Sequence, residues 1–206
     1  MVTAFVFAIA AEDRCHLNGM AMVNQMPKYV TVLGKTDIFG GWRENKASGG
    51  CILEVPTSKV ITEGLSMPHS PRIYGDRLWV LNSGYGELTG IDIASGKQSK
   101  IISLPGYTRG LAFFNKYAFI GLSKIRETAI LGDLPISDRL KDEIKCGIGV
   151  VDLQTGSLVG CLEFSAGIDE IFDVQIAPFA SAMISGPYIQ EDETSQIWSL
   201  PESAAK

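Results

Sequence analysis

The sequence is short of histidine, of regularly spaced cysteine and of positive charge. Two histidines and four cysteines occur among 206 residues, and the net charge is −5. The cysteines at positions 15, 51, 146 and 161 form no CxxC pair. Their wide spacing argues against a zinc ribbon or a dense disulfide framework and favours reduced, mostly buried thiols. The negative charge argues against a protein that binds nucleic acid through phosphate contacts.

The sequence also lacks an apolar run long enough to span a membrane. The N-terminal stretch MVTAFVFAIAAEDRC contains an apolar run of about eleven residues, too short for a span. It loosely resembles a signal peptide, but the positive residues that begin such a peptide are missing. Its β-branched and aromatic residues favour a buried strand. We therefore expect a cytoplasmic protein with neither a membrane nor a nucleic-acid partner.

What the sequence does contain is a series of short strand-like runs. Apolar residues make up 46% and charged residues 20% of the chain, a globular composition that predicts one domain over residues 1–206. Glycine, proline, Asn or Asp separates the runs. The runs are KYVTVLG, GCILEV, KVITEGL, RLWVLNSG, LTGIDI, SKIISL, YAFIGLS, GIGVVDL and LVGCLEF.

Two segments repeat one hairpin pattern. The segments are GIDIASGKQSKII and GVVDLQTGSLVGC. In each, two strands are joined by a turn with the pattern Asp-x-x-(Ser/Thr)-Gly. The glycine supplies the positive φ angle that such a tight turn requires. LEVPTSKVI is a version of the same turn without glycine.

The runs fall into four units that begin near residues 15, 69, 108 and 171. Four antiparallel strands in each unit are typical of the blades of a β-propeller. The last unit shows only three strands, and the N-terminal run could supply its outer strand. We predict an all-β fold, a β-propeller of about four blades or a partial propeller. One short inserted helix is predicted over 134–145, with Ser137 as its N-cap.

The loops of these units separate into two kinds. Because strand direction alternates, the loop before the first strand and the loop between the second and third strands share one end of each blade. That end receives the long polar loops, which are often functional, and the other end receives tight turns. The rare side chains His16, His69, Arg109 and Glu170 lie beside first strands, so we expect them to converge on one mouth.

Several chemistries fit such a mouth. An anionic small molecule would be bound by arginine forks and their neighbours, and the alternative is an ordinary network of ion pairs. Glu44, Glu127 and Glu170 could orient the cations. The predicted ligand-binding residues are His16, Asn18, Arg43, Lys46, His69, Arg72, Arg109 and Arg126, and Lys124 lies at the same end.

Two catalytic alternatives are weaker. His16, His69 and Glu170 or Asp173 have the chemistry of metal ligands, but no HxH or HExxH motif is present, and no metal or other cofactor is expected. Cys15 adjoins His16 and Ser70 adjoins His69, but adjacent residues in a strand point to opposite faces. Neither pair therefore forms a nucleophile and its base.

The motifs DRCHLNGMA, GGWRENKASGG, GLSMPHSPRIY, LPGYTRGLAF, GLSKIRE and CGIGVVDLQTG resemble a family of uncharacterised bacterial conserved hypothetical proteins. The family is propeller-like and related to quinoprotein-dehydrogenase-like repeats. The resemblance covers about residues 5–176 and implies the fold expected above. It implies no activity and no bound quinone, and such proteins are typically longer.

We expect a binding module for a small anionic ligand or a protein partner at the loop-rich face. The alternative is a propeller enzyme that acts on a small polar metabolite, for example a metal-dependent hydrolase or lyase. Its catalytic candidates are His16, His69 and Glu170. The sequence does not decide between the two, and it is compatible with a homo-oligomer.

Overall fold

The computed structural model describes residues 5–6, 11–124, 134–140, 143–178, 183–184 and 198–199. The chain forms two compact units, Met1–Gln175 and Ile176–Lys206. In the second unit, β13 (Met183–Ile184) pairs with β14 (Trp198–Ser199) as a two-stranded antiparallel sheet. The single domain over residues 1–206 stays a prediction.

The first unit contains three four-stranded antiparallel sheets whose strands follow one another in chain order. Sheet 1 consists of β1 (Leu17–Val23), β2 (Met26–Val32), β3 (Gly50–Glu54) and β4 (Val60–Leu65). Sheet 2 consists of β5 (Pro68–Tyr74), β6 (Arg77–Asn82), β7 (Glu87–Ile91) and β8 (Gln98–Ser103). Sheet 3 consists of β9 (Tyr107–Phe114), β10 (Tyr117–Ser123), β11 (Gly147–Asp152) and β12 (Ser157–Glu163). The all-β class and three of the predicted four-stranded units are confirmed, whereas a count of four blades stays a prediction.

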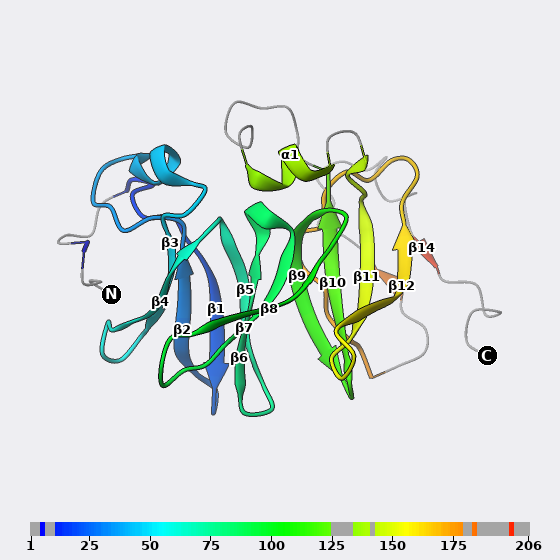
Figure 1. Cartoon of the computed structure of the whole chain (residues 1–206), viewed down its shortest axis with the longest axis horizontal. Coiled ribbons are helices and arrows are strands. Elements are labelled where there is room, and N and C mark those ends of the chain that lie inside the picture. Colours follow the sequence, from blue (N-terminus) through cyan, green and yellow to red (C-terminus); the bar gives the residue numbers. More distant parts are fainter. Residues whose placement is uncertain are drawn as a thin grey trace. The chain divides into compact units, whose positions relative to one another are not determined.

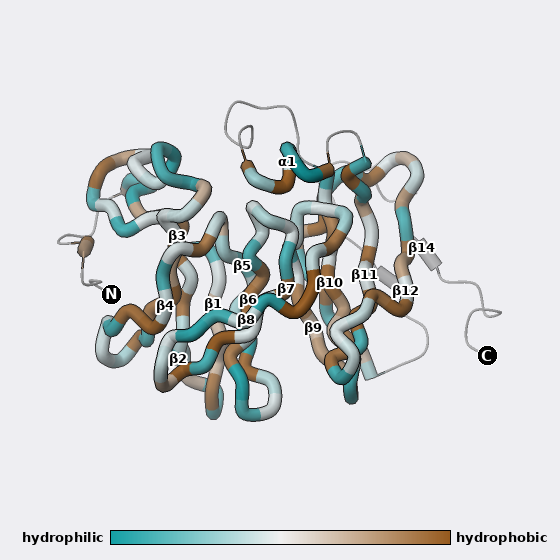
Figure 2. Tube along the Cα trace, in the orientation of Figure 1, coloured by the Kyte–Doolittle hydropathy of each residue, from teal (hydrophilic) through white to brown (hydrophobic). Residues whose placement is uncertain are grey.

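The sheets stack through their first strands. β1 contacts β5, and β5 contacts β9, so the three sheets follow one another across the unit (Figure 1). Apolar positions recur along the strands of all three sheets (Figure 2). One core lies between sheets 1 and 2 and includes Tyr29, Ile52 and Leu78. A second lies between sheets 2 and 3 and includes Leu81 and Ile120.

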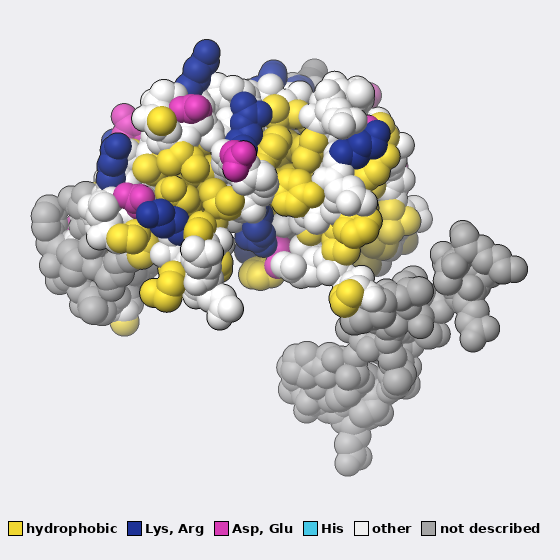
Figure 3. Space-filling model, turned by 90° about the horizontal axis from the view of Figure 1, so that it is seen from below, with side chains coloured by type: hydrophobic (Ala, Val, Ile, Leu, Met, Phe, Trp, Pro, Cys, Tyr) yellow, Lys and Arg dark blue, Asp and Glu magenta, His cyan; other side chains and the backbone are white. Residues whose placement is uncertain are grey.

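The loops separate into two ends as the alternation of strands predicts. Long connections, including the 3-10 helices η1 (Gly41–Asn45) and η2 (Ser83–Tyr85) and the helix α1 (Pro135–Leu140), lie at one end, and tight turns lie at the other (Figure 1). We call these the loop-bearing end and the tight-turn end. Neither histidine is visible when the unit is seen from the tight-turn end (Figure 3).

The repeated hairpin is confirmed. In one copy the Asp92 carboxylate accepts a hydrogen bond from the backbone N–H of Ser95, and Gly96 follows with φ of 72°. In the other, the Asp152 carboxylate accepts a bond from the N–H of Gln154, and Gly156 has φ of 68°. The short side chain of the aspartate closes the turn, and glycine adopts the left-handed conformation without steric cost.

Two expectations are wrong. Ser137 is not the N-cap of the helix, because α1 begins at Pro135, whose fixed φ and missing N–H suit the first helical position. Residues 171–178, expected as the first strand of a fourth unit, contain no strand.

The segment after β12 lies against sheet 3 without pairing as a strand. The N–H of Ile171 donates to Ser123 Oγ at 2.8 Å. A Cβ atom on Gly110, in β9, would lie 2.6 Å from the backbone nitrogen of Val174. The segment therefore passes β9 as closely as β1 passes β5, where a Cβ atom on Gly19 would lie 2.6 Å from Pro71 Cδ.

The N-terminal run, which was expected to supply the outer strand of the last unit, lies mostly outside the described residues. Phe5, which is described, packs against the face of sheet 1 that carries Val30 and Leu53. All four cysteines are free. No helix in the described part of the chain has the length and apolar character needed to cross a membrane.

Candidate functional site

An irregularity at the same place in each first strand shapes the loop-bearing end. The register of β1 shifts between Leu17 and Gly19, and that of β5 shifts between His69 and Arg72. The pairing of β9 with β10 shifts between Ile120 and Leu122, opposite Arg109 and Gly110. Bulges of this kind re-aim side chains.

The bulged residues connect neighbouring sheets. Asn18 Nδ2 donates to the carbonyl of Pro68 at 3.0 Å, and Asn18 Oδ1 accepts a bond from Thr31 at 2.6 Å. Ser70 Oγ accepts a bond from the N–H of Gly110 at 2.9 Å. Asn18 is thus held within the protein by both ends of its amide.

His69 is buried below the loop-bearing end. Only 7% of the residue is exposed, and its Nδ1 lies 2.8 Å from the Met67 carbonyl oxygen. Because that oxygen can only accept, Nδ1 carries the proton of the neutral ring. Burial lowers the pKa of His69 to about 4, and the charges of Arg109 and His16 act in the same direction. His69 is therefore neutral at pH 7.

Tyr107 completes the surroundings of His69. The two rings meet edge to face, with centroids 5.7 Å apart, and Ser83 Oγ lies 3.1 Å from His69 Nδ1. Burial raises the pKa of Tyr107, against the opposing effect of Arg109. The charge of Arg109 lowers the pKa of both groups, whereas Glu170 raises that of Tyr107.

Asp13 organises the other predicted histidine. Its carboxylate accepts bonds from His16 Nδ1 at 2.9 Å and from Trp42 Nε1 at 2.9 Å, and it lies 3.3 Å from Arg43. Burial raises the pKa of Asp13, but these hydrogen bonds and charges outweigh burial and hold the pKa below its usual value. The Arg43 guanidinium stacks over the ring of Trp42 at 4.6 Å.

Arg72 joins the three sheets. Its guanidinium donates to the carbonyls of Leu111 at 3.1 Å, Met20 at 3.5 Å and Pro71 at 3.0 Å. It also pairs with Asp173 at 3.4 Å. This side chain already has acceptors in β1, β5 and β9.

The remaining basic residues of the predicted site are Lys46, Lys124 and Arg126. Lys124 pairs with Asp169 at 3.5 Å. The backbone carbonyl of Lys46 accepts a bond from Ser66 at 3.1 Å. Arg126 and Glu127 lie outside the described residues.

An apolar cluster fills the centre of the loop-bearing end. It consists of Leu33, Trp42, Met67, Tyr107, Leu134 and Ile136, each at most 6% exposed. These residues come from loops, first strands and α1. Closely packed apolar side chains therefore occupy part of this end.

One cavity is lined by Arg109 and the segment after β12. It has a volume of about 330 Å³ and is bordered by Gly167, Ile168, Asp169, Glu170, Ile171 and Phe172. The Arg109 guanidinium lies 4.2 Å from the centroid of the Phe172 ring. Arg109 forms no ion pair with any residue that the structure describes.

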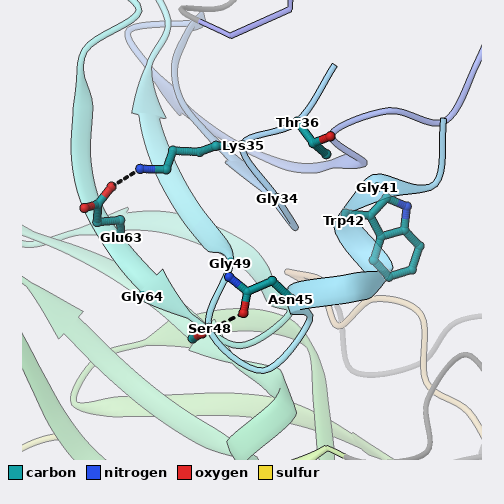
Figure 4. Close-up of a pocket in the computed structure, with 10 residues that line it drawn as sticks. All are labelled: Gly34, Lys35, Thr36, Gly41, Trp42, Asn45, Ser48, Gly49, Glu63 and Gly64. Carbon is teal, nitrogen blue, oxygen red and sulfur yellow. Dashed lines mark hydrogen bonds and ion pairs between the residues drawn. The ribbon is translucent and has the colours of Figure 1, made fainter. Parts of the chain in front are cut away.

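A second cavity, of about 480 Å³, lies beside η1. Figure 4 shows Lys35 and Glu63 on the side of β4, Asn45 and Ser48 at the base, and Trp42 on the far side of Gly34. Sequence reasoning missed Lys35 and Glu63, because Glu63 lies in an outer strand far along the chain. The glycine-rich loop before β3 was the available signal.

The predicted metal-ligand candidates do not form a metal site in the described part of the chain. Among the described residues, no three His, Cys, Asp or Glu side chains are grouped so that they could hold a metal ion. His16 is instead bonded to Asp13, and His69 to the Met67 carbonyl.

Stacked four-stranded sheets with polar bulges at one end define an all-β repeat protein. The chain belongs to the family DUF4915, a domain of unknown function, which matches residues 3–184. No curated protein sequence matches the chain. The relation to quinoprotein-dehydrogenase-like repeats stays a prediction.

Three solved structures are similar at low identity. The computationally designed Ika4 protein is 14% identical, with a TM-score of 0.47, over 98% of this chain and 100% of its own. The computationally designed Ika8 protein is 14% identical, with a TM-score of 0.44, over 81% of this chain and 42% of its own. BamB from Moraxella catarrhalis is 16% identical, with a TM-score of 0.35, over 73% of this chain and 54% of its own.

Proposed function

We propose that the protein is a binding module for a small anionic ligand, which occupies the cavity beside Arg109. The observation that carries this proposal is a guanidinium on the cavity wall without a carboxylate partner among the described residues. A guanidinium offers a planar set of donors that matches carboxylate and phosphate groups.

The other two predicted arginines that the structure describes already have carboxylate partners. Arg43 pairs with Asp13, and Arg72 pairs with Asp173. Arg109 instead packs on the face of the Phe172 ring, a contact that leaves the charge of the guanidinium unneutralised. Glu170 lines the same cavity and restricts an anion to the side of Arg109. His16 and His69, which the sequence nominated for the same ligand, are not among the residues that border this cavity.

A protein partner is the second form of this proposal. Phe172 is 76% exposed and Ile168 is 39% exposed, both beside Arg109. An exposed aromatic ring next to an arginine is typical of the residues that anchor protein interfaces. A partner would place an acidic side chain on Arg109 and an apolar one on Phe172.

The test is a thermal-stability screen with inorganic phosphate, sulfate and small di- and tricarboxylates. A ligand that binds only the folded state raises the unfolding midpoint by mass action. Arg109→Ala should fold normally and lose the shift. Arg77→Ala is the matched control, because Arg77 also stacks on an aromatic ring, Trp79 at 5.5 Å, but begins β6 at the tight-turn end. A shift that survives in Arg109→Ala would contradict the proposal.

An enzyme is the alternative, and the His16–Asp13 pair is the observation that favours it. A carboxylate that orients an imidazole is a common arrangement for a general base. Zn²⁺, Mn²⁺ and Ca²⁺ should then stabilise the wild type if the chemistry is metal-dependent, and His16→Ala should remove that effect. A cytoplasmic location and a homo-oligomer stay predictions.

A further inference from the structure

The cavity beside η1 is separate from the Arg109 site and has its own chemistry. Its walls come from the loop after β2 and from a bulge in β4. At this bulge Gly64 has φ of 83°, and a Cβ atom there would meet nothing within 4 Å. The backbone of the strand is therefore open toward the cavity, whose volume of about 480 Å³ suits a small molecule.

One wall carries a single positive and a single negative charge. Lys35 Nζ pairs with the carboxylate of Glu63, and the side chains are 43% and 60% exposed. An ion pair as exposed as this one contributes little to stability, so it can open at low cost. Figure 4 shows the pair at the edge of the cavity.

The base of the cavity offers uncharged polar groups. Asn45 Oδ1 accepts a bond from Ser48 Oγ at 2.9 Å, which leaves Asn45 Nδ2 without an acceptor in the described part of the chain. Thr36 Oγ1 accepts a bond from the N–H of Ile38 at 3.2 Å, and its own proton remains available. These groups can hydrogen-bond the polar or main-chain groups of a ligand.

We propose that this cavity binds a zwitterion of the amino acid or dipeptide class. The carboxylate of the ligand would replace Glu63 on Lys35, and its ammonium group would bind Glu63. A simple anion would gain Lys35 but leave Glu63 unpaired and facing a like charge, and a simple cation would leave Lys35 unpaired. A ligand with both charges gives both side chains a partner. The site would therefore select the zwitterion, because a ligand with a single charge leaves either Lys35 or Glu63 unpaired.

The test is isothermal titration of the full chain with free L-amino acids and dipeptides, each compared with its N-acetyl and amide derivatives. A zwitterion should bind, and removal of either of its charges should weaken binding about tenfold or more. Lys35→Met and Glu63→Gln should each weaken binding of the zwitterion by a similar factor. Glu63→Gln should also lose the preference for the zwitterion over the N-acetyl derivative.

The matched control is another ion pair in the same sheet, Lys28 with Glu54 at 2.7 Å. Lys28→Met and Glu54→Gln should bind as the wild type does, and so should Arg109→Ala, which separates this site from the anion site. Because all four side chains are at least partly exposed, the variants should keep the wild-type unfolding midpoint. If no zwitterion binds, or if the N-acetyl derivative binds equally well, the proposal is overturned.

Discussion

His69 shows how burial fixes the charge of one residue at the loop-bearing end. The ring lies among Met67, Ser83 and Tyr107, where a positive charge has lost its water and gained no carboxylate. A neutral imidazole is compatible with this environment, and a protonated one is not. The side chain the sequence nominated as an acid or a base is therefore held as a neutral donor to the Met67 carbonyl.

This burial predicts how stability depends on pH. The pKa of His69 is about 4 in the folded protein and about 6.5 in an unfolded chain. Between these values the unfolded chain binds more protons, so the free energy of unfolding falls as pH decreases from about 6.5 toward 4. From pH 7 to pH 5 we expect a loss of about 2 kcal/mol from this residue alone.

Urea unfolding at the two pH values measures this effect. His69→Gln keeps a donor for the Met67 carbonyl but does not titrate, so its stability should fall by about 2 kcal/mol less than that of the wild type over this interval. Equal pH dependence in both proteins would show that His69 gains its proton without cost in the folded state.

Arg72 is a second residue whose role follows from its position. Its guanidinium donates to carbonyls in three first strands and pairs with Asp173. Arg72→Met keeps most of the aliphatic stem but leaves these acceptors without their charged donor, so we expect a loss of about 2 kcal/mol. Denaturant unfolding measures it, with Arg77→Met as the control. A loss no larger than that of the control would mean that water replaces the guanidinium.

At the scale of elements, turns explain why the strands were predictable. The Asp-Gly turns and the alternation of apolar residues are local, and they correctly indicated β7, β8, β11 and β12. The helical spacing of apolar residues also indicated the helix, but it did not indicate where the helix starts. Serine is a common N-cap residue, which suggested Ser137, whereas the helix begins at Pro135. Local signals fix an element better than its boundary.

The turn between β3 and β4 offers a test of the same principle. It lacks the glycine of the other two turns, and Ser58 takes the left-handed conformation, with φ of 57°. A residue with a Cβ atom is strained there by about 1–2 kcal/mol, and glycine is not, although glycine costs about 0.5–1 kcal/mol more conformational entropy on folding. Ser58→Gly should therefore stabilise the protein by about 0.5–1 kcal/mol.

The reciprocal change provides the control. Gly156 has φ of 68°, and the nearest atom to a Cβ there would be the Ile101 carbonyl oxygen at 3.5 Å, so a serine would fit sterically. Gly156→Ser should destabilise the protein by about 1 kcal/mol for the same conformational reason. Thermal unfolding of the two variants should shift in opposite directions, and shifts of the same sign would refute the argument.

At the scale of the molecule, the candidate site was only partly predictable. Strand direction correctly predicted that the long loops and the tight turns lie at opposite ends, since that depends on the alternation of antiparallel strands. The convergence of His16, His69 and Arg109 on one mouth stays a prediction. The cluster that fills the centre of this end was not foreseen. Trp42 and Leu134 reach it from loops whose paths no periodic pattern encodes. The two cavities described at this end are lined by Arg109 and by Lys35 respectively.

The cores between the sheets predict which part of the chain folds by itself. Both of them, and the cluster at the loop-bearing end, consist of residues before Gln175. A chain that ends at Gln175 should therefore unfold cooperatively, with a midpoint within about 4 °C of that of the full chain, the shift expected for about 1 kcal/mol or less. Circular dichroism during thermal unfolding measures this.

A shorter chain tests whether residues 168–175 are the part of the C-terminal region that stabilises the three sheets. Ending the chain at Gly167 removes Val174, which is 7% exposed, the bonds of Ile171 to Ser123, and the carboxylate that pairs with Arg72. These contacts replace those of a neighbouring first strand, so their loss should lower the midpoint well beyond that of the longer truncation. If the chain ending at Gln175 instead loses cooperative unfolding, residues 176–206 complete the core. The prediction of one domain over residues 1–206 would then be the correct description.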